Sequence, residues 1–307
     1  MSYPVVGGHP NYSGTFIPEI WSSKLVEKYY DSTVLSQISN TDYEGEIRNQ
    51  GDKVKIRTVP TLEIHDYQIG QTLTNQRPES PIIELLIDKG FYWSAIIDDV
   101  VERQQDIDQM NLWAEDAAEQ MKIKLDTRVL GSIVPDIDPM NMGRTAGRIS
   151  QGIDLGAVGD PVSITRSNIL DTILYLGQVL DEQNVSETGR FILLPYWATT
   201  LLKLSDIKDA SLSGDGTSPL RNGRVGMIDR FTVYNSNLLP RYQDGSDVTT
   251  HIIAGTQAGL TFATQLTKTE SLRAESTFGN IMRGLMVYGS KVVKPEALAA
   301  AYIKPGT

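Results

Sequence analysis

The sequence contains no cysteine and no long run of apolar residues, and these two absences exclude several classes of protein. Without cysteine the chain can form neither a disulfide nor a thiolate metal site, and it has no thiol nucleophile. Such a chain fits a reducing site of synthesis. No run approaches the roughly 18 consecutive apolar residues that indicate a transmembrane helix. The N-terminus, MSYPVVGGHP, has neither a basic segment nor an apolar core, so we expect no signal peptide.

Basic residues are scarce relative to acidic ones. The 307 residues include 28 Lys and Arg but 38 Asp and Glu, which gives a formal net charge of −10. Proteins that grip a phosphate backbone neutralise it with Lys and Arg, so this charge argues against tight binding of nucleic acid. It does not argue against enclosing nucleic acid, because an acidic container would avoid adhering to its contents.

The residue patterns of enzymes are missing as well. The three histidines lie in unrelated contexts, and none has a second ligand at the spacing of a zinc site. No glycine-rich loop matches a phosphate-binding or dinucleotide-binding fingerprint, and no GxSxG elbow is present. The acidic pairs Asp98-Asp99 and Asp136-x-Asp138 fit helix caps better than metal ligands. We therefore predict no catalytic, cofactor-binding or metal-binding residue.

Residues 98–133 carry one long helical pattern. Acidic residues crowd its beginning and basic residues its end, as the helix dipole favours, and Gly131 predicts a C-terminal stop. A helix of this length spans about 40 Å, so we expect an elongated molecule. The alternative is a long core helix of a two-domain enzyme. The apolar face consists of Ile107, Met110, Ala114, Ala117, Met121, Leu125 and Val129.

The N-terminal part of the sequence predicts an extended arm that becomes ordered only against another surface. Residues 1–17 have almost no charge and are rich in Gly, Pro, Tyr and Asn. A short helix over residues 19–30 follows, with Trp21 on a loose apolar face. Such a segment gains little by folding on itself, so we expect its ordering to depend on a neighbour.

The pattern of residues 43–97 predicts a long two-stranded hairpin that projects from the body and has a polar tip. The strand at Lys53, Lys55 and Arg57 alternates strictly and has one basic face. Isolated two-stranded ribbons are marginally stable in water, so this one is expected to contact another copy. The basic face would then pair with acidic groups on that copy, and a solvated strand face is the alternative. Tyr67, in the tip, is a further contact candidate, as is Trp21.

The second half predicts an α/β region. A Gly/Asp/Pro-rich connection over residues 135–162 marks a region boundary, and a helix follows over residues 166–182. A buried strand at residues 190–194 precedes a helix that begins at Pro195. We expect residues 211–219 to form an exposed loop and alternating strands to follow it.

The order of these elements resembles the major capsid proteins of tailed bacteriophages. The stretch RNGRVGMIDRFTVYNSNLLP, at residues 221–240, is similar to a characteristic stretch of that family. Asp229 and Arg230 are a departure, because the family often has Gly nearby. Residues 252–263 and 287–297 fit the same pattern, and the resemblance covers the chain from about residue 18.

The resemblance implies an α+β fold, the tailed-phage major capsid fold, in which the extended loop overlaps an adjacent subunit. Residues 211–219 would lie at the five- and six-fold centres. The implied parts are an N-terminal arm (residues 1–42), a long β-hairpin extended loop (43–97), a peripheral domain with a long spine helix (98–160 and 276–307) and an α/β axial domain (161–275).

The resemblance also implies a function. The chain would be a structural major capsid protein that self-assembles as pentamers and hexamers into an icosahedral shell enclosing double-stranded DNA, without sequence-specific binding. The implied partners are other copies, a separate scaffolding protein, a portal and decoration proteins, with no cofactor and no membrane. The virion capsid would be assembled in the bacterial host cytoplasm. The alternatives are a cellular nanocompartment shell of the same fold and a soluble α/β enzyme.

Overall fold

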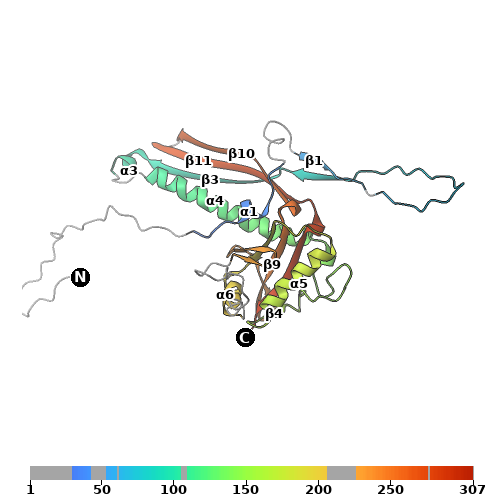
Figure 1. Cartoon of the computed structure of the whole chain (residues 1–307). Coiled ribbons are helices and arrows are strands. Elements are labelled where there is room, and N and C mark those ends of the chain that lie inside the picture. The colour runs from blue at the N-terminus through green and yellow to red at the C-terminus, as the bar shows by residue number, and fades with distance from the viewer. Residues whose placement is uncertain are drawn as a thin grey trace, which may run out of the picture.

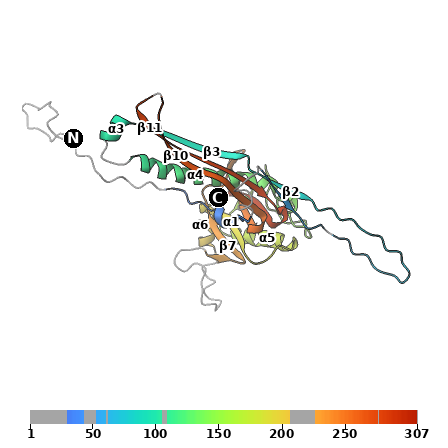
Figure 2. The same ribbon diagram turned by 90° about the horizontal axis from the view of Figure 1, so that it is seen from above.

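Three β-sheets and one long helix organise the part of the chain that the structure describes (Figure 1). A three-stranded sheet lies along helix α4 as an elongated layer, and a seven-stranded sheet lies beneath one end of it. A two-stranded hairpin projects from the same end, away from the body, in both views (Figures 1 and 2). The computed structural model describes residues 30–42, 53–60, 62–104, 109–205, 226–275 and 277–306.

The three-stranded sheet is antiparallel and packs one face on α4. Phe91 stacks on Tyr288 with 5.4 Å between ring centroids, and it lies under Lys124 and Arg128 of the helix. Successive strand residues point to opposite faces, so Tyr92 points away from the helix. In sheet order the strands are β10 (Leu260–Arg273), β11 (Gly279–Val292) and β3 (Lys89–Asp98).

The predicted long helix corresponds to α3 (Asp99–Gln104) and α4 (Gln109–Ile133), with residues 105–108 outside the described part. Its end at Ile133 is as predicted, but the proposed stop at Gly131 is wrong. The helix runs through Gly131, which is not among the glycines with a positive φ and therefore makes no left-handed C-terminal turn. A Cβ there would make only an ordinary van der Waals contact, 3.6 Å from the ring of Pro240. The chain then continues into the 3₁₀ helix η1 (Val134–Asp136).

The predicted apolar face of α4 is buried only towards its C-terminal end. Leu125 and Val129 are buried, whereas Met121, Ala117 and Ala114 are partly exposed. The buried half lies where the helix also meets the seven-stranded sheet. The exposed half lies where only the three-stranded sheet covers it.

The seven-stranded sheet mixes parallel and antiparallel pairs. Its last strand, β12, pairs in parallel with β4 on one side and antiparallel with β9 on the other. The order is β4-β12-β9-β5-β7-β6, and β8 pairs with β9. The bounds are β4 (Val162–Ile164), β12 (Leu298–Pro305), β9 (Asp247–Thr256), β5 (Arg190–Leu194), β7 (Phe231–Asn235), β6 (Met227–Ile228) and β8 (Arg241–Asp244).

Two helices, α5 (Ile169–Glu182) and α6 (Tyr196–Leu204), pack on one face of this sheet. In β5, Ile192 and Leu194 face that layer, whereas Phe191 and Leu193 face the core shared with α4. The predicted strand at residues 190–194 is therefore confirmed as buried on both faces. Among the described residues, the remaining short helices are α1 (Leu35–Ile38), η2 (Pro139–Asn141), η5 (Gln257–Gly259) and η6 (Pro295–Ala297).

Helix α5 begins three residues later than predicted, because Asn168 closes a turn in front of it. The Asn168 side chain accepts a hydrogen bond from the Thr165 N–H (2.7 Å) and donates one to the Ser163 carbonyl (2.8 Å). The strand pair predicted after residue 223 is present as β6 and β7, joined at Asp229, whose φ of 52° is left-handed. Residues 221–225 and the loop at 211–219 lie outside the described residues.

The sheets group three segments differently from the division based on sequence. β3 was expected in the extended loop and β10 in the axial region, yet both join β11 in the three-stranded sheet. β12 was expected in the peripheral region but lies inside the seven-stranded sheet. Strand pairing depends on partners distant in the chain, and local residue patterns do not encode it.

Candidate subunit-contact surfaces

The three basic residues predicted as contact candidates lie on the exposed face of β1 (Lys53–Arg57), which pairs with β2 (Ile82–Leu86). Glu84 of β2 lies 3.8 Å from Lys53 Nζ and 3.7 Å from Lys55 Nζ. Such exposed pairs contribute about 0–1 kcal/mol, so both lysines could exchange partners at little cost. Arg57 has no ion pair within the described part of the chain, which makes it the most available of the three.

Beyond these strands, side chains hold the loop together in place of a β-ladder. The Thr58 hydroxyl donates to the Pro81 carbonyl (2.8 Å). Gln76 reaches across the loop: its Oε1 accepts from the Glu63 N–H (3.1 Å), and its Nε2 donates to the Glu63 carbonyl (2.9 Å). The Nε2 atom also lies 2.9 Å from His65 Nε2. No sequence motif marks Gln76, so sequence reasoning missed it.

The loop exposes many large apolar side chains. Ile69 is 98% exposed and Ile64 is 91% exposed, although fully burying one such side chain stabilises by about 1.5–3 kcal/mol. The predicted candidate Tyr67 belongs to this group, whereas Trp21 lies outside the described residues. Patches of this kind mark contact sites. The exposed set is Val59, Leu62, Ile64, Tyr67, Ile69 and Leu73.

In contrast, the root of the loop is packed. A separate apolar cluster joins the two strands of the hairpin to the three-stranded sheet and to the segment that follows it. Leu85 is completely buried there. The loop therefore leaves the body from an anchored base. The cluster consists of Val54, Ile56, Leu85, Ile87, Ala263 and Val293.

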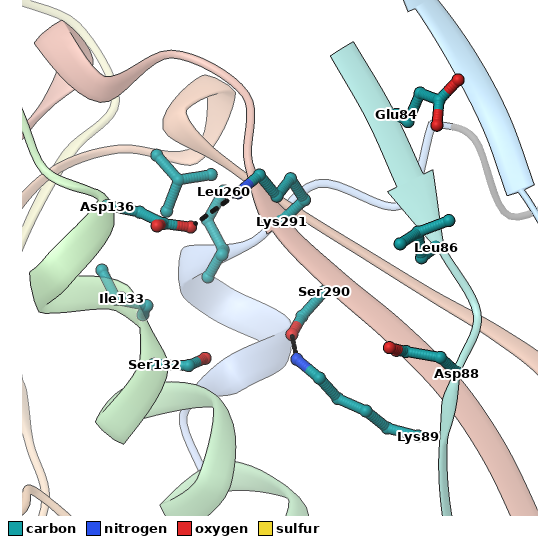
Figure 3. A pocket seen from close by; sticks show the side chains of 11 residues that line it. Glu84, Leu86, Asp88, Lys89, Ser132, Ile133, Asp136, Leu260, Ser290 and Lys291 are labelled. Carbon is teal, nitrogen blue, oxygen red and sulfur yellow. Dashed lines mark hydrogen bonds and ion pairs between the residues drawn. The ribbon is translucent and has the colours of Figure 1, made fainter.

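A cleft of about 220 Å³ lies between this root and the end of α4 (Figure 3). On one side, Lys291 of β11 forms an ion pair with Asp136 at 3.0 Å. Lys89 reaches towards Ser290, with 3.5 Å between Nζ and Oγ, and Glu84 lines the wall formed by β2. The ion pair between Lys291 and Asp136 holds the segment that follows α4 against β11, beside the loop.

The described end of the N-terminal arm is attached to α4 by a buried carboxylate. Asp126 is 2% exposed, and its Oδ2 accepts from the N–H groups of Val34 (2.6 Å) and Leu35 (3.2 Å) at the start of α1. Burial raises the pKa of Asp126, against the lowering effect of these two hydrogen bonds. Tyr30 adds an exposed hydrogen bond to Asp116. Sequence reasoning missed Asp126, which lies among the charged residues of a helix.

The face of the three-stranded sheet opposite α4 is open. Tyr92 is 82% exposed, and Ile96 and Leu285 are exposed beside it. Between them, Glu270 accepts from Arg283 Nη2 (2.8 Å) and pairs with Lys268. These cations lower the pKa of Glu270. Exposed apolar groups that gather on one face in this way are suited to contact with another protein surface.

Titratable groups elsewhere fit a structural role. His251 lies between the rings of Tyr242 and Tyr302, at centroid distances of 5.4 and 4.8 Å, and burial lowers its pKa to about 4. Among the described residues, no three or more His, Cys, Asp or Glu side chains are grouped so that they could hold a metal ion. Within the same residues, no helix is long and apolar enough to cross a membrane.

Comparisons with known proteins support the resemblance found in the sequence. A family model described as phage capsid protein matches residues 87–301. A search of curated proteins finds no match.

Among solved structures, the chain is similar to one from Mycobacterium phage Che8, with a TM-score of 0.75 and 23% identity over 93% of this chain and 96% of that one. It is also similar to the capsid of Cyanophage P-SCSP1u (TM-score 0.72, 14% identity, 95% of this chain and 94% of that one). The capsid of a native GTA particle gives a TM-score of 0.67 at 13% identity, over 96% of this chain and 98% of that one. These likenesses confirm the predicted fold class.

Proposed function

Because the chain belongs to the phage capsid protein family, we propose that its copies assemble as pentamers and hexamers into an icosahedral shell enclosing double-stranded DNA. The role is structural, and we propose no catalysis. The observation that carries the proposal is the extended loop, which leaves six large apolar side chains exposed on a projection anchored at its root. A soluble monomer would gain nothing from this arrangement, whereas a neighbouring copy could cover it.

The two ends of the subunit support head-to-tail contact. The loop projects from one end, and the open sheet face with Tyr92 and Leu285 extends towards the other (Figures 1 and 2). Contacts between unlike surfaces close into rings when the rotation between copies permits it. Many modest contacts then act together, because each one raises the effective concentration of the next.

We assign the peripheral role to the three-stranded sheet with α4 and the axial role to the seven-stranded sheet. The arm, residues 1–42, would contact a neighbour beyond its attachment at Asp126. Lys53, Lys55, Arg57, Tyr67 and Trp21 remain the proposed contact residues. The net charge of −10 fits a shell that encloses DNA without gripping it.

Further partners follow from this role. We propose a separate scaffolding protein, a portal and decoration proteins in addition to other copies of the chain. Assembly would take place in the cytoplasm of a bacterial host, and the product would be the capsid of the virion.

The test is to purify the full chain and examine it by size-exclusion chromatography and electron microscopy. We expect closed megadalton particles, and a stable monomer or dimer would refute the proposal. The nucleic-acid content of particles purified from infected cells separates a genome container from a compartment with protein cargo.

A loop deletion makes the test specific. Replacing residues 59–81 by Asn-Gly-Thr keeps β1, β2 and the packed root, and the Thr in place of Pro81 supplies the N–H that closes the two-residue turn. We expect this variant to fold as a soluble subunit and to form no shells. Normal shells from it would show that the loop is not the contact that closes the assembly.

A further inference from the structure

The root of the extended loop crosses β11 at one glycine. β3 stops pairing with β11 at Lys89 and Tyr288, and the chain segment on its N-terminal side turns away there to form β2. At the next residue of β11, Gly289, a Cβ would lie 2.2 Å from the carbonyl oxygen of Leu86 and 3.1 Å from its carbonyl carbon. The backbones of β2 and β11 are thus in direct contact.

The contact leaves the loop little freedom to move at this point. Any side chain at position 289 would need the Leu86 carbonyl to move from 2.2 Å to beyond 3.0 Å, and the obstacle is backbone that cannot rotate aside. Ile87 also approaches, with its Cδ1 atom 2.8 Å from the same Cβ position. Ile87 belongs to the apolar cluster with Leu85 and Val293, so the same contact is also held by the packing of the root.

From this geometry we infer that Gly289 is a positioning residue that sets the direction in which the extended loop leaves the body. Through that direction it sets the angle between neighbouring subunits. The second statement rests on the proposed shell function, and the first does not. The angle is then a property of the single folded subunit and exists before any neighbour binds.

Because the loop is long, a small displacement at its root produces a larger displacement at its tip. The turn at Gly70 lies 16 residues from Leu86, about 50 Å of extended chain. The root strands are about 17 Å long. A rotation that shifts the root by 1 Å about a pivot one strand length away would therefore move the tip by roughly 3 Å.

The absence of cysteine allows a direct measurement of the loop direction on the unassembled full chain. Spin labels on Leu62→Cys in the loop and Glu115→Cys on α4 report the distance between loop and body. We expect one narrow distance distribution in the parent. In Gly289→Ala we expect the mean distance to shift by about 2 Å, because Leu62 lies nine residues beyond Lys53, the partner of Leu86, which is about 30 Å of extended chain. The matched control is Gly226→Ala, because a Cβ at Gly226 meets nothing within 4 Å.

A second variant covers the case in which Gly289→Ala fails to fold. Ile87→Ala loosens the root without adding an atom. The distribution of distances between the two labels should therefore widen, and the mean distance should not change. A broad distribution in the parent, or an unchanged distribution in Gly289→Ala or in Ile87→Ala, would overturn the assignment of loop direction to this contact.

Assembly tests the second statement separately. Under conditions in which the parent forms shells, Gly289→Ala should form shells of different diameter or open sheets, and Gly226→Ala should behave as the parent. Shells of parental diameter from a Gly289→Ala chain with a shifted loop would overturn the link to the subunit angle. If the parent forms no shells, the proposed function fails, while the spectroscopic result on loop direction stands.

Discussion

Gln76 forms two hydrogen bonds with the backbone of Glu63, across a loop that has no β-ladder at that level. The side-chain amide therefore joins the two segments with two hydrogen bonds, as one hydrogen-bonded residue pair of an antiparallel sheet would. It joins two exposed segments whose apolar side chains are free to contact another molecule.

Gln76→Ala should loosen the loop above its root. One lost hydrogen bond of about 1 kcal/mol corresponds to roughly fivefold faster hydrogen exchange at the Glu63 amide. The global free energy of unfolding should change by less than about 0.5 kcal/mol, because the site is exposed. Thr74→Ala, on the same exposed segment, is the control. Equal exchange at Glu63 in both variants would show that the amide bridge does not hold the loop.

Asp126→Ala should destabilise the subunit and release the arm. It leaves the N–H groups of Val34 and Leu35 buried without their acceptor, at about 1–3 kcal/mol for each unsatisfied group. Asp126→Asn retains an acceptor oxygen and should lose about half as much or less. Urea unfolding measures the stability, and limited proteolysis near residue 30 reports the arm. Equal losses in both variants would mean that packing, and not the acceptor, explains the effect.

His251 should make the subunit sensitive to mild acid. Its pKa is about 4 in the folded chain and 6.5 in the unfolded chain, so the unfolded state binds the proton first as the pH falls. Its contribution to stability is complete above about pH 6.5 and is lost towards pH 4, to a total of about 3 kcal/mol.

Comparing urea unfolding at pH 7 and pH 4.5 isolates this contribution. His251→Gln should lose less stability between the two pH values than the parent does. His65→Gln, which replaces the exposed loop histidine, should lose as much as the parent. Parental acid sensitivity in His251→Gln would refute the assignment.

Arg57→Glu should impair shell assembly and leave the subunit folded. Lys53 and Lys55 already have Glu84 as a partner, so Arg57 is the basic group best placed to pair with another copy. The fraction of protein in closed particles measures the effect, and Arg57→Lys, which keeps the charge, is the control. Normal shells from the triple variant with Glu at 53, 55 and 57 would exclude any role for this face.

Local patterns predicted those elements whose burial repeats regularly along the chain. The alternation in β1 placed Val54 and Ile56 inside and the basic residues outside. The apolar run of β5 predicted a buried strand, and the structure covers it on both faces. The end of α4 was predicted at Ile133, but the stop signal proposed at Gly131 was wrong, because the helix runs through Gly131 without a left-handed turn.

Other features depend on groups that meet only in the folded chain. Asp126 and Gln76 each act on backbone atoms far away in the sequence, and such atoms leave no mark in the residue pattern. The membership of β3, β10 and β12 in their sheets depends likewise on partner strands, which pattern alone does not identify.

The position of β12 in the large sheet determines when that sheet can close during translation. It lies between β4 and β9, yet its residues, 298–305, are synthesised after both of those strands. A nascent chain that has not released them holds β4 and β9 without the strand that joins them. Domains usually fold as units during translation, N-terminal regions first. Here closure of the large sheet must wait until translation has passed residue 305, so β4 stays without its parallel partner until then.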